Sequence, residues 1–155
     1  MAKLVKVVPG VGSVSGPDAS EVSDVRKAIV AAGLSILGTP YLWGGKASAD
    51  VENPVGLDCS GYSKWCCEHG GVSIPEGSRN QAAACQSIDA ADALPGDLIF
   101  KSKDGSAEGV HHVGVVLDST SVMEAPATGY LIRVAKRWVS KPGDFVFYGR
   151  PEGLS

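Results

Sequence analysis

The chain has 155 residues, of which 44% are hydrophobic and 20% charged, so it is long enough to bury the core of one globular domain. Its formal net charge is −3, its sequence pI is about 5.5, and no run of Lys or Arg stands out. We therefore expect neither nucleic acid nor an anionic membrane as a partner. The longest apolar runs, such as residues 113–117, are far too short to insert across a bilayer.

The first 20 residues are rich in Gly, Pro, Val and Ser and are predicted to form an arm or linker. Residues 21–155 would then form a single domain. The opening sequence MAKLVKVVPGVGSVSGP lacks a sustained apolar stretch and a small-residue cleavage site, so we do not predict a signal peptide. A role outside the cytosol would need another export route or a longer chain.

A first helix is predicted within residues 18–40. Ser20 is its expected N-cap, and Gly38 and Pro40 end it. Apolar residues recur there at steps of three and four, which indicates one buried face. They are Val22, Val25, Ile29, Ala32 and Ile36.

A second helix is predicted over residues 59–69, after a loop rich in Gly, Asn and Pro. Gly70 and Gly71 supply its left-handed stop. Residues 78–88 are predicted to form a further short helix.

The second half of the chain contains short runs rich in β-branched residues, separated by Gly, Pro, Asp and Ser. They are GDLIF (96–100), HHVGVVL (111–117), SVMEA (121–125), YLIRVAKR (130–137) and DFVFYGR (144–150). Helices followed by strands predict an α+β domain in which N-terminal helices pack on an antiparallel sheet.

Three of the four cysteines fall within the predicted second helix, and this cluster has several interpretations. A zinc site would use Cys66, Cys67, His69 and Cys85, but adjacent helical cysteines point about 100° apart, and no paired C-x-x-C motif is present. A disulfide between neighbours is also unfavourable. We expect reduced thiols, and buried apolar packing is the ordinary role for three of them.

Cys59 differs because it lies in the first turn of the predicted helix, directly after Asp58. Unpaired N–H groups and the positive end of the helix dipole favour a thiolate there. A nucleophilic thiol also needs a base. His69 lies about 15 Å along the same helix and is too far, whereas either His111 or His112 could reach across from a strand. This pairing is typical of papain-like peptidases.

Six short stretches have a common order and sensible spacing over residues 38–150. They are GTPYLWGG (38–45), LDCSGY (57–62), GVSIPEGSRNQ (71–81), LPGDLIF (94–100), HVGVVL (112–117) and VMEAP (122–126). Together they resemble the NlpC-type family of bacterial and phage cell-wall cysteine peptidases. The resemblance implies a compact papain-like fold.

The resemblance implies that Cys59 is the nucleophile and that His112, which directly precedes a Val-Gly pair, is the general base and acid. The third catalytic residue would be Glu124, at a position where the family commonly has His. A hairpin that turns near Asp118 would place His112 and Glu124 opposite each other on one face. A carboxylate there would orient the imidazole and stabilise its protonated form.

The resemblance also implies substrate-binding residues. Asp58 and Ser60 would hold polar groups on the N-terminal side of the substrate, although Asp58 could also simply cap the helix. Tyr41 would reach the nucleophile, and Trp43 would shape the wall of the cleft. Arg79 and Gln81 match family positions without an assigned chemistry. Residues 46–57 form a longer connection than is usual, which we expect to lie at the rim of the cleft.

The implied function is a peptidoglycan hydrolase that cleaves the γ-D-glutamyl bond to the diamino acid of stem peptides, without metal or cofactor. Alternatives are an N-acetylmuramoyl-L-alanine amidase of the same fold and a non-catalytic cell-wall binding module. We expect a monomer that acts at the bacterial cell wall. It could be a phage endolysin, a tail lysin module or a secreted enzyme.

Overall fold

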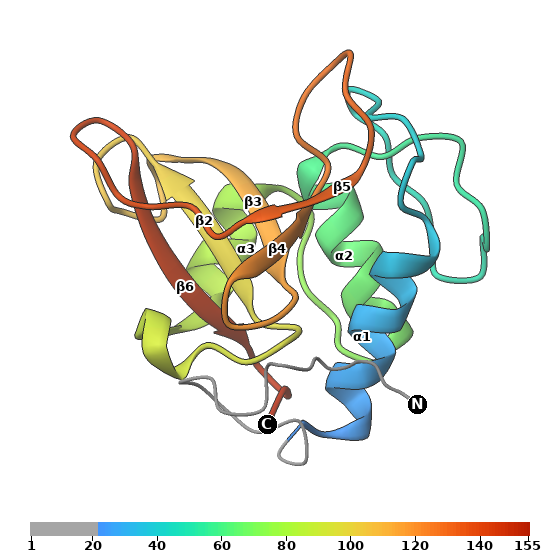
Figure 1. Ribbon diagram of the computed structural model, residues 1–155, viewed down its shortest axis with the longest axis horizontal. Helices are drawn as coiled ribbons and strands as arrows, with labels where there is room; N and C mark the ends of the chain where they lie inside the picture. Colours follow the sequence, from blue (N-terminus) through green and yellow to red (C-terminus); the bar gives the residue numbers. More distant parts are fainter. Residues whose placement is uncertain (1–21) are drawn as a thin grey trace.

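The computed structural model describes residues 22–155, so the predicted arm at residues 1–20 lies outside the described residues. Helices pack against a six-stranded antiparallel sheet of strand order β1-β6-β2-β3-β4-β5 (Figure 1). The helices are α1 (Asp24–Ser35), α2 (Cys59–His69), α3 (Ser78–Ala84) and the short 3-10 helix η2 (Ala90–Asp92). The strands are β1 (Cys85–Ile88), β2 (Leu98–Ser102), β3 (Val110–Val116), β4 (Ser121–Glu124), β5 (Arg133–Lys136) and β6 (Phe145–Pro151). The predicted α+β architecture, with helices packed on an antiparallel sheet, is confirmed.

Helix α1 begins at Asp24, and its N-cap is Ser23, whose side chain accepts a hydrogen bond from the Arg26 amide. The predicted cap, Ser20, lies outside the described residues. Ile29 faces the main core as expected, but Val25 is 38% exposed and Arg26 is fully buried. The predicted apolar face is therefore rotated at its N-terminal end, because a buried carboxylate binds the guanidinium.

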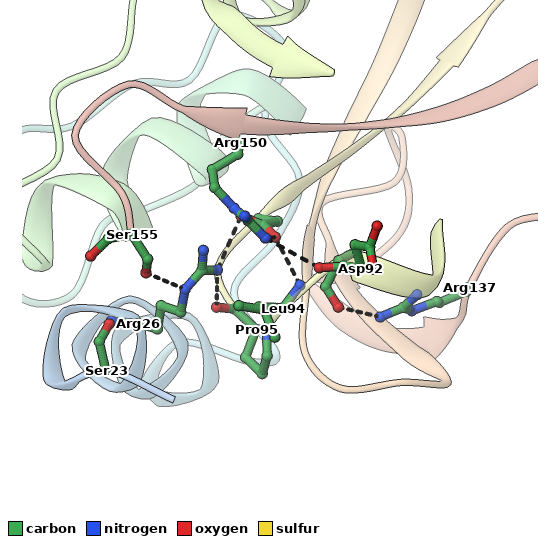
Figure 2. A network of polar contacts seen from close by, with 10 residues as sticks. Ser23, Arg26, Asp92, Leu94, Pro95, Arg137, Arg150 and Ser155 are labelled. Carbon is green, nitrogen blue, oxygen red and sulfur yellow. Dashed lines mark hydrogen bonds and ion pairs between the residues drawn. The ribbon is translucent and has the colours of Figure 1, made fainter. Parts of the chain in front are cut away.

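That carboxylate belongs to Asp97, which directly precedes β2. Figure 2 labels its two partners, Arg26 and Arg150. The two carboxylate oxygens receive Nη1 of Arg26 at 3.0 Å and Nη2 of Arg150 at 2.8 Å. Arg26 also donates to the carbonyls of Pro95 at 3.0 Å and Ser155 at 2.8 Å. The network joins α1, the start of β2 and the C-terminal segment, and buried charges require such pairing.

Helix α2 starts and ends as predicted. The Asp58 carboxylate caps it by accepting the Gly61 amide at 2.6 Å, and Gly71 adopts the left-handed conformation with φ 79° just beyond its end. Its buried side chains include Trp65, Cys66 and Cys67, which lie in the main core between the helices and the sheet. Among residues 22–155, no helix is long and apolar enough to cross a membrane.

All five predicted strands form. The predicted helix over residues 78–88 is confirmed only in its first part. It ends at Ala84, and the next four residues become β1, which pairs with β6 in the register Cys85 opposite Pro151. Pairing with a distant strand overrides the local preference of this segment, and such non-local pairing cannot be read from local sequence.

The β3–β4 hairpin pairs Val115 with Met123 and Val116 with Val122. Extending this register places Glu124 across from Gly114. The predicted direct opposition of Glu124 to His112 was therefore wrong, because the residue opposite Glu124 lies two positions after His112 on β3. His112 and Glu124 still share a face, as diagonal neighbours, because side chains alternate along a strand.

Candidate active site

The loop at residues 40–45 lies close against the first turn of α2. The Asp58 amide donates to the Gly45 carbonyl at 3.0 Å, and a Cβ atom on Gly61 would collide with that same carbonyl oxygen. Glycine at both positions allows this close backbone approach. The approach fixes the start of α2 and therefore the position of Cys59.

The Cys59 thiol lies at the N-terminus of α2 against the backbone of β3. Burial raises its pKa, and the charge of Asp58 adds to this, whereas backbone N–H groups of Val113, Ser60 and Cys59 itself act in the opposite direction. The expectation of a thiolate favoured by the helix terminus was therefore wrong, because desolvation exceeds the effect of the backbone donors. The net effect of these influences raises the pKa of the Cys59 thiol, which favours its neutral form.

Val113 directly follows His112 in the chain, so its contact with Cys59 brings the thiol to the part of β3 that carries His112. Cys59 and His112 are not hydrogen-bonded to each other in this structure. Catalytic hydrogen bonds often tighten only when substrate binds, so proton transfer requires the imidazole to close on the thiol.

His112 is hydrogen-bonded to a buried carboxylate. Its Nε2 atom lies 2.8 Å from Oε1 of Glu124, and Glu124 is only 3% exposed. The other oxygen, Oε2, receives Nε and Nη2 of Arg133, each at 3.0 Å, from the directly opposite position on β5. The carboxylate therefore joins an imidazole and a guanidinium.

Two opposing influences determine the protonation of Glu124. Burial, the largest single influence, would raise its pKa, but the hydrogen bonds and charges of His112 and Arg133 together outweigh it and lower the pKa. Glu124 is therefore ionised near neutral pH. An ionised partner keeps the proton on Nε2 of His112 and leaves Nδ1 as the free base.

His111, the other histidine that the sequence left open, has a different partner. Its Nε2 atom lies 3.0 Å from Oδ1 of Asp144, and its side chain is 42% exposed. His112, and not His111, is therefore the histidine that is hydrogen-bonded to the buried carboxylate of Glu124. His69 lies at the far end of α2, where its Nδ1 atom contacts the Trp65 carbonyl.

Trp138 packs on the His112 ring, with the ring centroids 4.9 Å apart, and Nζ of Lys101 lies 4.8 Å from the centroid of the Trp138 ring. These side chains border a pocket of about 370 Å³, which we call the His112 pocket. It is lined by Lys101, His111, His112, Glu124, Pro126, Arg133, Ala135 and Trp138.

Sequence reasoning missed Arg133 and Trp138. Arg133 belongs to a predicted strand, but its contact with Glu124 depends on the register between β4 and β5, which no local pattern reveals. Trp138 lies in a connection after β5 and carries no motif.

The predicted substrate-binding residues fall into two groups. Burial, followed by the charges of Cys59 and Asp58, raises the pKa of Tyr41, so Tyr41 lies near both. Oδ1 of Asp58 accepts from Gly61 and from the Ser60 hydroxyl at 3.3 Å. Asp58 therefore caps the helix and also adjoins the thiol.

Trp43 is separate from this group because its side chain is 83% exposed at the loop surface. A second pocket of about 300 Å³ opens beside α2. It is lined by Lys46, Ala47, Ser48, Ser60, Gly61, Lys64, Glu68, Glu76 and Gly77. Residues 46–48 of the long connection thus border a pocket that includes Ser60.

The remaining cysteines have packing roles. All four cysteines are free, Cys66 and Cys67 are fully buried, and burial raises the pKa of Cys67 and of Cys85 to about 12. No group of three or more His, Cys, Asp or Glu side chains within residues 22–155 is arranged to hold a metal ion.

Gln81 has a structural role that the sequence did not assign. It is fully buried, and its amide donates to the carbonyls of Ser60 and Pro75, each at 3.0 Å, while Oε1 accepts from the Ser63 hydroxyl at 2.6 Å. Arg79 donates to the Val110 carbonyl at 3.2 Å. Both residues hold α3 against elements that carry the site.

The NlpC/P60 family model matches residues 38–141. The chain belongs to this family. It is 32% identical over 133 residues to a gamma-D-glutamyl-L-lysine dipeptidyl-peptidase of Bacillus subtilis (strain 168), covering 84% of this chain and 43% of that protein. It is also 32% identical over 114 residues to the peptidoglycan endopeptidase RipA of Mycobacterium tuberculosis (strain H37Rv), covering 69% of this chain and 23% of RipA.

Solved NlpC/P60 structures agree with the fold. The peptidoglycan hydrolase RipB from Mycobacterium tuberculosis superposes with a TM-score of 0.66 at 30% identity, over 91% of this chain and 75% of that chain. The chain spans less than half the length of the curated NlpC/P60 relatives described above.

Proposed function

We propose that this NlpC/P60 chain is a peptidoglycan hydrolase, a cysteine endopeptidase that cleaves the γ-D-glutamyl bond to the diamino acid of stem peptides. The observation that carries the proposal is a thiol at a helix N-terminus, beside a strand whose histidine is hydrogen-bonded to a buried carboxylate. Such a constellation suits acyl transfer. The names of the Bacillus subtilis and mycobacterial relatives support the substrate class.

The proposed reaction starts from neutral Cys59. Nδ1 of His112 takes the thiol proton as sulfur attacks the γ-glutamyl carbonyl carbon, and Glu124 stabilises the imidazolium that forms. Backbone N–H groups at the start of α2 stabilise the oxyanion. His112 then returns its proton to the departing amine, which leaves a thioester on Cys59.

Water completes the cycle. His112 removes a proton from the water as it attacks the thioester, and the released thiolate regains that proton. The acid product and the neutral thiol result, so protons and electrons balance without a cofactor. Every step uses side chains and backbone N–H groups of this chain, together with one water molecule.

Asp58, Ser60 and Tyr41 are suited to hold the part of the substrate N-terminal to the cleaved bond. Oδ2 of Asp58 has only a distant ion pair, 3.7 Å from Nζ of Lys46, which is 44% exposed. A free substrate amine can replace this loose partner, whereas Oδ1 remains bound to the helix. We assign Trp43, at the exposed edge of the same loop, to contact with the larger wall polymer.

The proposed setting is the bacterial cell wall, where the chain would act as a monomer, released by a phage or exported within a longer protein. Two other activities fit the same fold. An amidase would use the same Cys59 and His112, with specificity set by loop shape. A binding module would not need a nucleophile, a base and a carboxylate together, and the presence of all three favours the enzyme.

The test is incubation with purified peptidoglycan and with defined stem peptides, followed by mass spectrometry. The proposal predicts new free amines on the diamino acid, absent with Cys59→Ala. A free L-alanine amine instead would identify an amidase. Binding without any cleavage would identify a binding module.

A further inference from the structure

We propose that the His112 pocket is the subsite for the departing diamino acid and that it binds a carboxylate on that residue's side chain, which selects diaminopimelate over lysine. This inference rests on the proposed function and adds the substrate type. Two cationic side chains on its walls, Lys101 and Arg133, provide the recognition.

The location follows from the chemistry. The departing amine receives its proton from His112, so the departing residue must lie on the His112 side of the nucleophile. The His112 pocket includes His112, Glu124 and Trp138, whereas Cys59 and Ser60 lie outside it. The second pocket is lined by Ser60 and Gly61, which follow Cys59 in the chain, and it contains no residue of the His112 pocket, so it suits the acyl part of the substrate.

The charge of the pocket is the main observation. Lys101 is half-buried over the Trp138 ring, and no carboxylate within the described part of the chain lies within ion-pairing distance of its Nζ. Arg133 uses Nε and Nη2 on Glu124, and its Nη1 atom has no hydrogen-bond partner among residues 22–155. Two cationic donors thus remain available.

The topology places these donors on two walls. Lys101 belongs to β2 and lies opposite His112 in the register, whereas Arg133 belongs to β5, two strands beyond β3. The other charges that line the pocket are already paired. Glu124 binds both His112 and Arg133, and His111 faces Asp144.

This arrangement discriminates between the two diamino acids. Diaminopimelate carries a carboxylate on the carbon that bears its side-chain amine, and lysine has only the amine. The carboxylate would pair with Lys101 and Nη1 of Arg133, whereas a lysine ammonium alone would face two like charges. A volume of about 370 Å³ can accommodate one side chain of this size.

The experiment compares three peptides of the form L-Ala-γ-D-Glu-X-D-Ala, where X is diaminopimelate, diaminopimelate with its side-chain carboxylate amidated, or lysine. Amidation removes the charge and keeps the shape. We expect kcat/KM for the diaminopimelate peptide to exceed that for the other two by about tenfold. Lys101→Gln should bring the ratio between the charged and amidated peptides close to one.

Lys103→Gln is the matched control, because Lys103 is an exposed lysine just beyond the same strand and outside the pocket. It should leave the tenfold ratio intact. Equal cleavage of all three peptides by the natural protein would overturn the subsite while leaving the endopeptidase in place. An equal loss on all three in Lys101→Gln would show a structural role and also overturn it. No cleavage of any peptide would contradict the proposed function itself.

Discussion

Two buried carboxylates at opposite ends of the sheet each lie between two cationic side chains, yet they serve different purposes. Asp97 precedes β2 and is bound by Arg26 and Arg150. Glu124 ends β4 and is bound by His112 and Arg133. Because β2 and β4 both run antiparallel to β3, the start of one and the end of the other lie at opposite ends of the sheet (Figure 1).

The difference lies in one partner. Both partners of Asp97 are guanidiniums, which keep their charge throughout the pH range of a folded protein, so that network can only hold elements together. Glu124 has one guanidinium and one imidazole, and an imidazole can gain and lose a proton near neutral pH. The same kind of network therefore stabilises one end of the molecule and suits the other for proton transfer.

The largest effect is expected from Glu124→Gln. Removing the carboxylate charge withdraws stabilisation from the imidazolium and disturbs the tautomer, so kcat/KM on a stem peptide should fall about 10³-fold. The melting temperature is the control, since the Arg133 side chain is 48% exposed and its charge stays solvated when the carboxylate is removed. A fall of less than about threefold would mean that Glu124 has no role in the reaction.

Asp97→Asn should have the opposite effect, a loss of stability with little change in peptide cleavage. It leaves Arg26 buried without its counter-charge, and breaking a buried pair in this way costs about 3 kcal/mol of the free energy of unfolding. Denaturant titration measures this loss. Peptide cleavage well below the unfolding transition should stay within about twofold of the natural protein. Loss of activity in a folded Asp97→Asn protein would refute the separation of the two ends.

Arg133→Gln should have a smaller effect of about tenfold, which is concentrated at low pH. Arg133 helps to lower the pKa of Glu124, so its removal raises that pKa. Glu124 acts in its ionised form, which predominates above its pKa, and activity is lost as the pH falls through that pKa. The acid limb of the kcat/KM profile should therefore move to higher pH. An unshifted limb with a uniform decrease would indicate that Arg133 only packs against the site.

The smallest effect concerns the thiols. Burial raises the pKa of Cys59 above its ordinary value of 9.0, so iodoacetamide labelling should be slow at neutral pH and still increasing above pH 9. Cys67 and Cys85, with pKa values of about 12, should label more slowly throughout. Peptide mapping distinguishes the sites. Rapid labelling of Cys59 at pH 7 would show a thiolate and contradict the neutral resting state.

Local patterns predicted much of this fold. The cap at Asp58, the left-handed Gly71 after α2 and the five β-branched runs all depend on neighbours in sequence, and the structure has them where expected, although Gly70 is not left-handed. The shared face of His112 and Glu124 follows from strand alternation together with an even offset in the β3–β4 hairpin register. These are features that a few consecutive residues determine.

Features that depend on distant partners could not be predicted. The burial of Arg26 depends on Asp97, and the contact of Arg133 with Glu124 depends on the register of two strands. The pKa of Cys59 depends on how deeply the loop and β3 bury its sulfur, which outweighs the helix terminus that the sequence does reveal. Tertiary contact, rather than local preference, decides each case.

The central claim is that Cys59 forms a covalent thioester with the acyl part of a stem peptide. Cleavage of L-Ala-γ-D-Glu-diaminopimelate in the presence of hydroxylamine tests it directly, because hydroxylamine intercepts a thioester to give a hydroxamate. The account predicts L-Ala-γ-D-glutamyl hydroxamate, formed at the expense of the free acid and absent with Cys59→Ala. Amine release without hydroxamate, or continued cleavage by Cys59→Ala, would contradict it.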